Sequence, residues 1–257
     1  MPRLDIEQVP VLSDNYSYLL HDPETGATGV IDPAEADPVI AALDARGWRL
    51  THVLNTHHHG DHTGGNLLLK QRFGCTVIGA GRDSERIPGI DRQVGDRDSF
   101  LLGAVAVIVI EVPGHTSGHI AYWVPENRAV FCGDTLFSLG CGRLFEGTAA
   151  QMWDSLCKLR GLPDDTLVFC AHEYTQSNAR FARTIESGNP DLMARIAEIE
   201  QLRGLGLPTV PSSLGQEKAV NPFLRADEVT VKRAVGLADD ADPAQVFAEI
   251  RRRKDVF

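Results

Sequence analysis

The sequence lacks the features of several common protein classes. Its five cysteines are odd in number and contain no C-x-x-C pair, which favours reduced thiols over a disulfide framework. No apolar run approaches the roughly 20 residues that a membrane helix needs. The first ten residues, MPRLDIEQVP, lack the apolar stretch of a signal peptide. We therefore expect a cytoplasmic protein with no membrane partner.

Positive charge is also scarce. The formal net charge is −10, and binding to nucleic acid or to anionic lipid needs clustered Lys and Arg. The composition therefore argues against both partners. With 257 residues and 43 % hydrophobic side chains, the chain can bury a core in one large domain or two smaller ones.

The first two thirds of the chain mix strand and helix patterns. Alternating or β-branched runs predict strands at 16–20, 28–32, 50–56, 76–80, 105–114 and 166–173, and a hairpin over 119–134. Helices are predicted at 37–47, 64–74 and 150–162. In the first of these, Asp37 is the expected N-terminal cap and Gly47 the expected end.

The last third favours helix. Helical spacing appears at 176–188, 189–206, 227–238 and 242–254, and no strand is expected there. We predict a metal-binding catalytic domain at 1–174 and a helical substrate-binding domain at 175–257. Mixed strands and helices joined by short turns favour an α/β layered sandwich for the first domain.

A metal site is predicted by "THHHGDHTGGN", residues 56–66. If "THHH" continues a strand, His57 and His59 point to one side and His58 to the other. Gly60 then lets the chain bend, so that Asp61 and His62 can join the same pocket. One ion with an open position needs about three protein ligands, so four from one turn suggest two ions.

Further donors follow other apolar runs. His115, Asp134 and His172 each stand where a predicted strand reaches the surface. The sequence thus offers seven nitrogen or oxygen ligands, three or more for each of two ions. A carboxylate can bridge two cations, and Asp134 is the natural bridge.

Other polar residues near these motifs have plainer interpretations. His58 is expected to pack against other side chains or to support a metal ligand. For His119, a position outside the coordination sphere is favoured over a role as a ligand. His21 and His52 are treated as ordinary histidines. Asp32 could orient a metal-bound imidazole or cap a turn.

The motifs "THHHGDH", "PGHTSGH", "GDTLF" and "AHEYT" resemble those of the metallo-β-lactamase superfamily. More narrowly, "LSDNYSYLL", "GCGRLFEGTA", "NPFLR" and the basic end "RRRKD" make the chain similar to glyoxalase II, the hydroxyacylglutathione hydrolases. The resemblance covers essentially the whole chain. It implies an αββα four-layer sandwich with a C-terminal helical domain.

The resemblance also implies ligand sets. One metal ion would be held by His57, His59 and His115. A second would be held by Asp61, His62 and His172, with Asp134 between the two. Both carboxylates lie at the reacting centre, where a metal-bridging hydroxide is the implied nucleophile. Zinc, iron and manganese all suit these donors, and zinc is the expected metal.

The implied substrate is a glutathione thioester. By resemblance, its peptide tail is held by Arg143, Phe145, Tyr174, Arg251 and Lys254. Arg143 stands where Lys is usual, which keeps the charge. Phe145 stands where Tyr is usual, which removes a hydroxyl contact. Arg251 and Lys254 lie three residues apart on one helical face, whereas Arg252 and Arg253 are expected to face water.

The resemblance implies a monomeric thioester hydrolase that converts S-(D-lactoyl)glutathione to glutathione and D-lactate. An alternative is a persulfide dioxygenase-like oxidoreductase of the same superfamily with one iron. The helical C-terminal part argues against it. Lactam or lactone hydrolysis is a third possibility, and a non-catalytic binding module with structural metals is a fourth.

Overall fold

The computed structural model describes residues 2–257. The chain divides into two compact units. The first comprises Met1–Glu111 and Gly118–Gly133, and the second comprises Val112–Ser117 and Asp134–Phe257. The predicted domain boundary after residue 174 stays a prediction. Among the residues described, no helix has both the length and the apolar character needed to cross a membrane.

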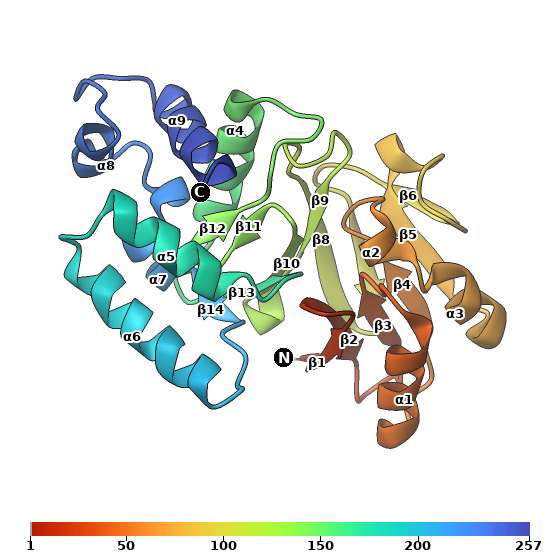
Figure 1. The fold of residues 1–257 in the computed structure, drawn as a ribbon. Coiled ribbons are helices and arrows are strands. Elements are labelled where there is room, and N and C mark those ends of the chain that lie inside the picture. The colour runs from red at the N-terminus through yellow and green to blue at the C-terminus, as the bar shows by residue number, and fades with distance from the viewer. Residues whose placement is uncertain (1) are drawn as a thin grey trace. The chain divides into compact units, whose positions relative to one another are not determined.

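The first unit contains a six-stranded sheet with strands in chain order (Figure 1). These strands are β1 (Asp5–Val11), β2 (Asn15–His21), β3 (Thr28–Ile31), β4 (His52–Leu54), β5 (Thr76–Ala80) and β6 (Arg92–Val94). The first three pair antiparallel, and β3 to β6 pair in parallel. The parallel strands all end at one edge of the sheet, and the chain segments that follow them begin there.

Helices α1 (Ala36–Arg46) and α3 (Asn66–Phe73) pack on this sheet. Val39 and Leu43 of α1 and Leu69 of α3 share one buried cluster with the strands. Helix α1 ends at Gly47, whose positive φ of 65° suits glycine, as expected. The expected cap is wrong, because Asp37 lies inside the first turn, and the residue before the helix is Glu35.

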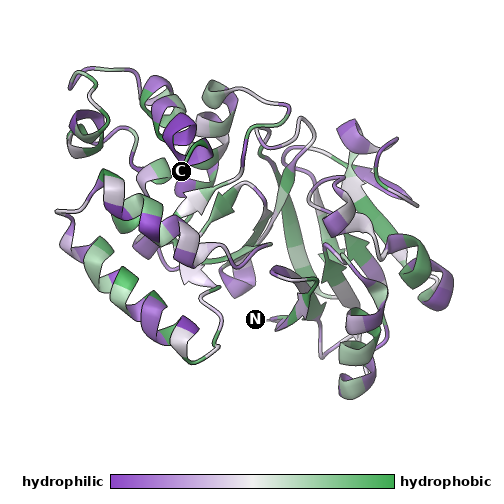
Figure 2. Ribbon diagram, in the orientation of Figure 1, coloured by the Kyte–Doolittle hydropathy of each residue, from purple (hydrophilic) through white to green (hydrophobic). Residues whose placement is uncertain are grey.

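A second group of strands covers the other face of the first sheet. It contains β7 (Ser99–Leu102), β8 (Val105–Glu111), β9 (Ile120–Val124) and β10 (Ala129–Gly133), each antiparallel to the next. Tyr122 donates from β9 to the carbonyls of Asn55 and Ile78, and Tyr18 of β2 packs on Phe131 of β10. Figure 2 shows strongly hydrophobic strands here. The expected hairpin is confirmed.

The second unit is mainly helical (Figure 1). Its helices are α4 (Ala149–Arg160), α5 (Thr175–Ile185), α6 (Pro190–Gly204), α7 (Leu214–Val220), α8 (Val229–Ala234) and α9 (Pro243–Asp255). It also contains the hairpin β11 (Leu136–Phe137) with β12 (Gly140–Cys141), and β13 (Leu167–Cys170) paired with β14 (Ser212–Ser213). Strand β14 and helix α7 were not expected. Both are too short to show a periodic pattern in the sequence.

Candidate metal centre and substrate site

The histidine-rich segment of the first unit leaves the sheet before the histidines begin. Strand β4 ends at Leu54, so the expectation that "THHH" continues it is wrong. His59 instead precedes the short helix α2 (Gly60–Thr63). His57 Nε2 lies 3.0 Å from His59 Nδ1, whereas His58 Nδ1 lies 3.1 Å from Asp83 Oδ2. His57 and His59 thus share a site without His58, and a turn produces this arrangement.

Helix α2 brings the next two predicted ligands together. His62 Nε2 lies 3.5 Å from Asp61 Oδ2. Asn15, at the start of β2, donates to the Asp61 carboxylate at 3.1 Å and to its carbonyl at 3.3 Å. Asn15 is a site residue that the sequence reasoning missed, although it stands in the motif "LSDNYSYLL". Its amide fixes the position of the Asp61 carboxylate.

Asp32 orients one imidazole, as one of its two expected roles requires. Its Oδ2 lies 3.0 Å from His62 Nδ1 and accepts from Thr56 Oγ1 at 2.6 Å, while Oδ1 accepts from Thr56 N at 2.7 Å. Asp32 is buried. A carboxylate at Nδ1 holds the proton there, and the lone pair of Nε2 can then bind a metal.

Two glycines allow α3 to begin directly beside the loop that carries Asp32. A Cβ on Gly64 would lie 2.5 Å from the carbonyl oxygen of Ala34, and one on Gly65 would lie 2.8 Å from that of Pro33. The backbone therefore approaches this loop so closely at both positions that only glycine fits. A larger residue would push the histidine segment away from Asp32.

The second unit gathers its own three predicted ligands. His115 Nε2 lies 3.4 Å from Asp134 Oδ2, and His172 Nε2 lies 3.3 Å from Asp134 Oδ1. All three residues are buried. The backbone carbonyl of Arg143 lies 2.9 Å from His115 Nδ1. This contact again holds the proton on Nδ1 and directs Nε2 toward the carboxylate.

These donor spacings suit a shared cation. Two donors at about 2.0–2.1 Å from a tetrahedral zinc lie about 3.3 Å apart. The four pairs above lie 3.0, 3.5, 3.4 and 3.3 Å apart. Within the first unit, donor atoms of Asp32, His57 and His62 also lie within 4.8 Å of one another. Neutral imidazoles and carboxylates are donors that zinc, iron and manganese accept. The residues present therefore fit divalent metal ions.

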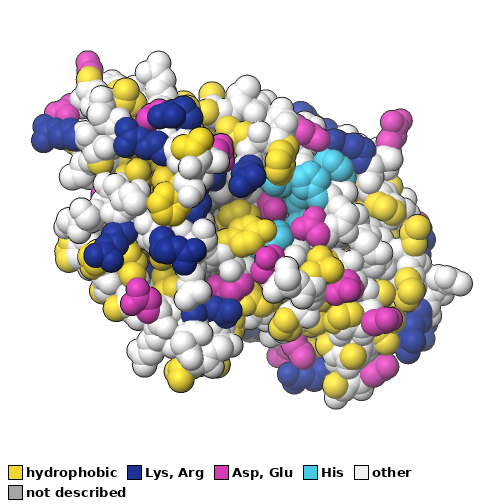
Figure 3. Space-filling model, in the orientation of Figure 1, with side chains coloured by type: hydrophobic (Ala, Val, Ile, Leu, Met, Phe, Trp, Pro, Cys, Tyr) yellow, Lys and Arg dark blue, Asp and Glu magenta, His cyan; other side chains and the backbone are white. Residues whose placement is uncertain are grey.

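The remaining histidines have other surroundings. His119 is buried and its ring stacks on that of His57, with centroids 4.6 Å apart. His21 stacks on Trp48 at 4.3 Å. Burial, and then the charge of Arg92, lower the pKa of His52. Figure 3 shows that some histidine side chains are exposed on the viewed face of the molecule.

Two buried cysteines are unsuited to nucleophilic chemistry. None of the five cysteines forms a disulfide within residues 2–257. Burial raises the pKa of Cys141 to about 11 and that of Cys170 to about 12. Both side chains are therefore thiols at neutral pH, and thiolate nucleophiles are absent at these two positions.

Three of the predicted substrate-binding residues lie next to the ligands of the second unit. Tyr174 is 40 % exposed and its ring stacks on that of His172 with centroids 4.6 Å apart. Phe145 is 63 % exposed and sits edge-on to His115, with centroids 5.1 Å apart. Arg143 has an exposed side chain, and its carbonyl is the group that contacts His115. This surface offers two aromatic rings packed on predicted metal ligands, and an exposed cation at position 143.

The predicted cations of α9 differ in their surroundings. Arg251 is buried, donates to the carbonyl of Cys141 at 2.9 Å and pairs with Asp255. Lys254 is half-buried and donates to Ser177. Arg252 is exposed as expected, whereas Arg253 is only partly exposed because it donates to the carbonyls of Ala234 and Val235.

Lys254 stands in a positive field. Desolvation first, and then the charges of Arg251, Arg180 and Arg143, lower its pKa to about 8. Arg180, on α5, is exposed and was missed by sequence reasoning. Lys and Arg side chains are prominent over the helical region of the second unit (Figure 3). Such a group of cations suits an anion, despite the overall charge of −10.

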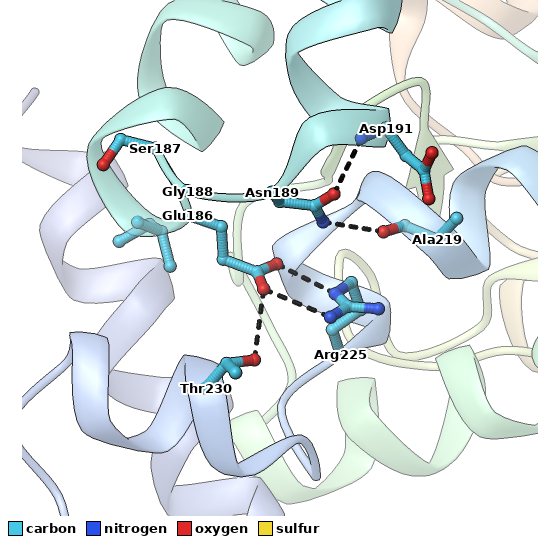
Figure 4. A pocket seen from close by; sticks show the side chains of 9 residues that line it. Glu186, Ser187, Gly188, Asn189, Asp191, Ala219, Arg225 and Thr230 are labelled. Carbon is cyan, nitrogen blue, oxygen red and sulfur yellow. Dashed lines mark hydrogen bonds and ion pairs between the residues drawn. The ribbon is translucent and has the colours of Figure 1, made fainter.

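A separate cavity of about 500 Å³ is lined in part by one residue of a further motif (Figure 4). Arg225, from "NPFLR", donates to both oxygens of Glu186 at its wall, at 2.8 and 3.1 Å. None of the predicted site residues lines this cavity. Arg225 therefore serves the packing of α5 against the segment after α7.

Comparisons with known proteins show the family of the chain. Residues 12–172 match the metallo-β-lactamase superfamily, and residues 173–257 match the hydroxyacylglutathione hydrolase C-terminus. The chain is 61 % identical to a hydroxyacylglutathione hydrolase of Methylococcus capsulatus over 99 % of both chains. The chain belongs to the hydroxyacylglutathione hydrolase family. A second family member, from Rhodospirillum rubrum, is 58 % identical over the full length of both chains.

A solved structure supports the fold. The B3 metallo-β-lactamase BLEG-1 is 22 % identical with a TM-score of 0.66, and the match covers 86 % of this chain and 99 % of that one. At this identity the likeness speaks for the fold alone. The expected metallo-β-lactamase fold with a helical C-terminal part is confirmed, and so is an enzyme of the hydroxyacylglutathione hydrolase family. The relatives support a hydrolase and give no support to the dioxygenase alternative.

Proposed function

We propose that this enzyme hydrolyses S-(D-lactoyl)glutathione with two divalent metal ions. Water adds to the thioester carbonyl carbon, the carbon–sulfur bond breaks, and D-lactate and glutathione are released. The observation that carries the proposal is the spacing of the donor pairs, 3.0–3.5 Å, in a chain with full-length relatives of that name. A thiolate is a good leaving group because a thiol pKa is about 8.5, so no separate general acid is needed.

We assign the seven donors to two sets. His57, His59 and His115 would hold one ion, and Asp61, His62 and His172 the other. Asp134 would contact both. When bound, divalent cations supply Lewis acidity, which lowers the pKa of water and stabilises negative charge on a carbonyl oxygen. Zinc is the metal we expect.

The protein's part is to hold these donors in one protonation state. Asp32 and the carbonyl of Arg143 each hold a proton on an imidazole Nδ1. Asn15 keeps the Asp61 carboxylate in place. These partners would orient the donor atoms toward the ions.

The helical part would hold the peptide tail. Glutathione carries two carboxylates and one ammonium, so it is an anion that a protein of charge −10 repels at long range. Arg143, Arg251 and Lys254 would supply local positive charge, and Phe145 and Tyr174 would also contact the peptide tail. Tyr174 and Phe145 pack on metal-site histidines, so binding of the tail would place the carbonyl near the ions.

Metal analysis combined with a thioester assay tests the proposal. We expect two metal ions per chain and loss of thioester absorbance with release of free thiol. Oxygen uptake with glutathione persulfide tests the dioxygenase alternative, and we expect none. Two ions without thioester cleavage would refute the assigned substrate. The monomeric state and the cytoplasmic location stay predictions from the sequence.

A further inference from the structure

The ammonium of Lys254 is fixed from several sides. Its Nζ donates to the carbonyl oxygen of Ser177 at 3.1 Å and to the Oγ of Ser177 at 3.3 Å. It also lies 5.3 Å from the ring centroid of Phe181 and 5.3 Å from that of Phe257. An ammonium has three donors, so these contacts leave one for a substrate oxygen.

The two rings have different structural duties. Phe181, on α5, is 1 % exposed and belongs to the core of the second unit, where it stacks with Phe223. Phe257 is 62 % exposed and sits edge-on to Phe181, with centroids 5.5 Å apart. An exposed ring adds little to core packing. The main contact that Phe257 makes is therefore with Phe181 and the Lys254 ammonium.

The backbone explains how Phe257 reaches this place. Helix α9 ends at Asp255, and the N–H of Phe257 donates to the carbonyl of Lys254 at 3.4 Å. The chain thus turns back over the side chain of Lys254 at once. Val256, the residue between, is 80 % exposed and its side chain points to solvent. The side chain of Val256 thus points to solvent, whereas the ring of Phe257 lies near Lys254 Nζ. A substitution at Val256 therefore serves as a matched control.

We propose that Phe257 is a positioning residue for substrate binding, which acts through Lys254. The rings of Phe181 and Phe257 both contact the ammonium, and we call these two side chains the cage. The cage and Ser177 hold the Lys254 ammonium so that one of its N–H groups can donate to a carboxylate of the substrate. The inference rests on the proposed function, because it takes Lys254 as a contact of the glutathione tail.

The cage also has an electrostatic reason. Lys254 is repelled by the charges of Arg251, Arg180 and Arg143. A free lysine side chain would swing away from these cations into water. The negative faces of two aromatic rings attract the ammonium and oppose that movement. The ring of Phe257 thus keeps the positive charges gathered before substrate arrives.

Steady-state kinetics of the metal-loaded enzyme test this role. A cation–π contact at a partly exposed site supports about a threefold to fivefold rise in KM for F257A, with kcat unchanged. F257Y should restore the KM of the parent enzyme, because it keeps the ring. F257L keeps apolar bulk without the ring and should not. V256A is the matched control and should leave both constants unchanged.

A double-mutant cycle separates positioning from direct contact with substrate. K254M removes the ammonium and keeps the apolar stem. If Phe257 acts through Lys254, F257A adds nothing to the KM of K254M. An equal further rise in the K254M background would overturn the inference, and so would an F257A enzyme with unchanged KM.

Binding of glutathione to the metal-loaded protein, measured by calorimetric titration, distinguishes this inference from the proposed function. If the parent enzyme does not cleave lactoylglutathione, the proposed function fails. If it does cleave the thioester, and F257A binds glutathione as tightly as the parent, only the inference about Phe257 fails. A weaker affinity for glutathione in F257A, absent in the K254M background, supports it.

Discussion

Replacing Asp32 by Asn should change which ring nitrogen of His62 carries the proton, with almost no change in side-chain size. In Asp32, Oδ1 accepts from Thr56 N and Oδ2 faces both Thr56 Oγ1 and His62 Nδ1. In D32N, the amide oxygen keeps the bond to Thr56 N. The amide nitrogen then faces His62 Nδ1 and donates to it. The ring proton of His62 therefore moves to Nε2, the atom that we expect to bind a metal.

The size of the effect follows from the two roles of the Asp32 carboxylate, in metal binding and in folding. Removing the partner that orients a metal-binding histidine costs about 10- to 100-fold in metal affinity, or about 1.4–2.8 kcal/mol. Removing a charge-assisted hydrogen bond at a buried site costs about 1–3 kcal/mol of unfolding free energy. We therefore expect D32N to fold and to bind the ion assigned to His62 about 10- to 100-fold less tightly. The affinity for the other ion should be kept.

Competition with a chromophoric chelator measures both zinc affinities of the metal-free protein, and urea unfolding measures its stability. D22N is the matched control. Asp22 is also buried and accepts from Ala104 N, Thr25 Oγ1 and Glu24 N, far in sequence from any predicted ligand. D22N should lose stability with zinc affinities unchanged. A D32N protein with both zinc affinities intact would refute the argument from the imidazole proton.

Three other outcomes follow from the structure. KM for the glutathione thioester should rise as pH increases through about 8, with kcat unaffected, because deprotonation of Lys254 removes a positive charge from the tail site. R225A should lower the unfolding free energy by about 3 kcal/mol in urea titration, because it leaves the buried carboxylate of Glu186 without its cation. G142A should lose at least about 2 kcal/mol of unfolding free energy and also weaken metal binding, because its Cβ would collide with the carbonyl oxygen of Asp134.

Each of these predictions has a control. In K254R the charge persists at all accessible pH values, so the rise of KM near pH 8 should disappear. G204A, at a helix end with no neighbour within 4 Å of the added Cβ, should leave metal binding unchanged. R225K tests whether charge alone suffices, since a lysine cannot form the two parallel bonds to Glu186. Unchanged urea midpoints for R225A and G142A would contradict the packing described above.

The donors of the candidate metal site could be proposed from the sequence, because their chemistry is visible in residue type and spacing. His57 and His59 are separated from His58, as expected. The physical reason differs, because a turn before α2 replaces the strand alternation. Where a bend replaces the last residues of a predicted strand, periodicity cannot distinguish the two from so few positions.

Supporting contacts were harder to foresee. Asn15 lies 46 residues from Asp61, and the carbonyl of Arg143 lies 28 residues from His115. Nothing local marks such pairs, since they form only when the chain folds. The cage of Phe181 and Phe257 around Lys254 is of the same kind. A basic helix end predicts positive charge but not what holds it.

Anomalous diffraction from crystals of the zinc-loaded enzyme tests the central claim most directly. We predict two zinc peaks about 3.5–4 Å apart. One should be bound by His57, His59 and His115, the other by Asp61, His62 and His172, with Asp134 touching both. A single peak at full zinc loading, or two peaks held by other side chains, would contradict the proposed centre.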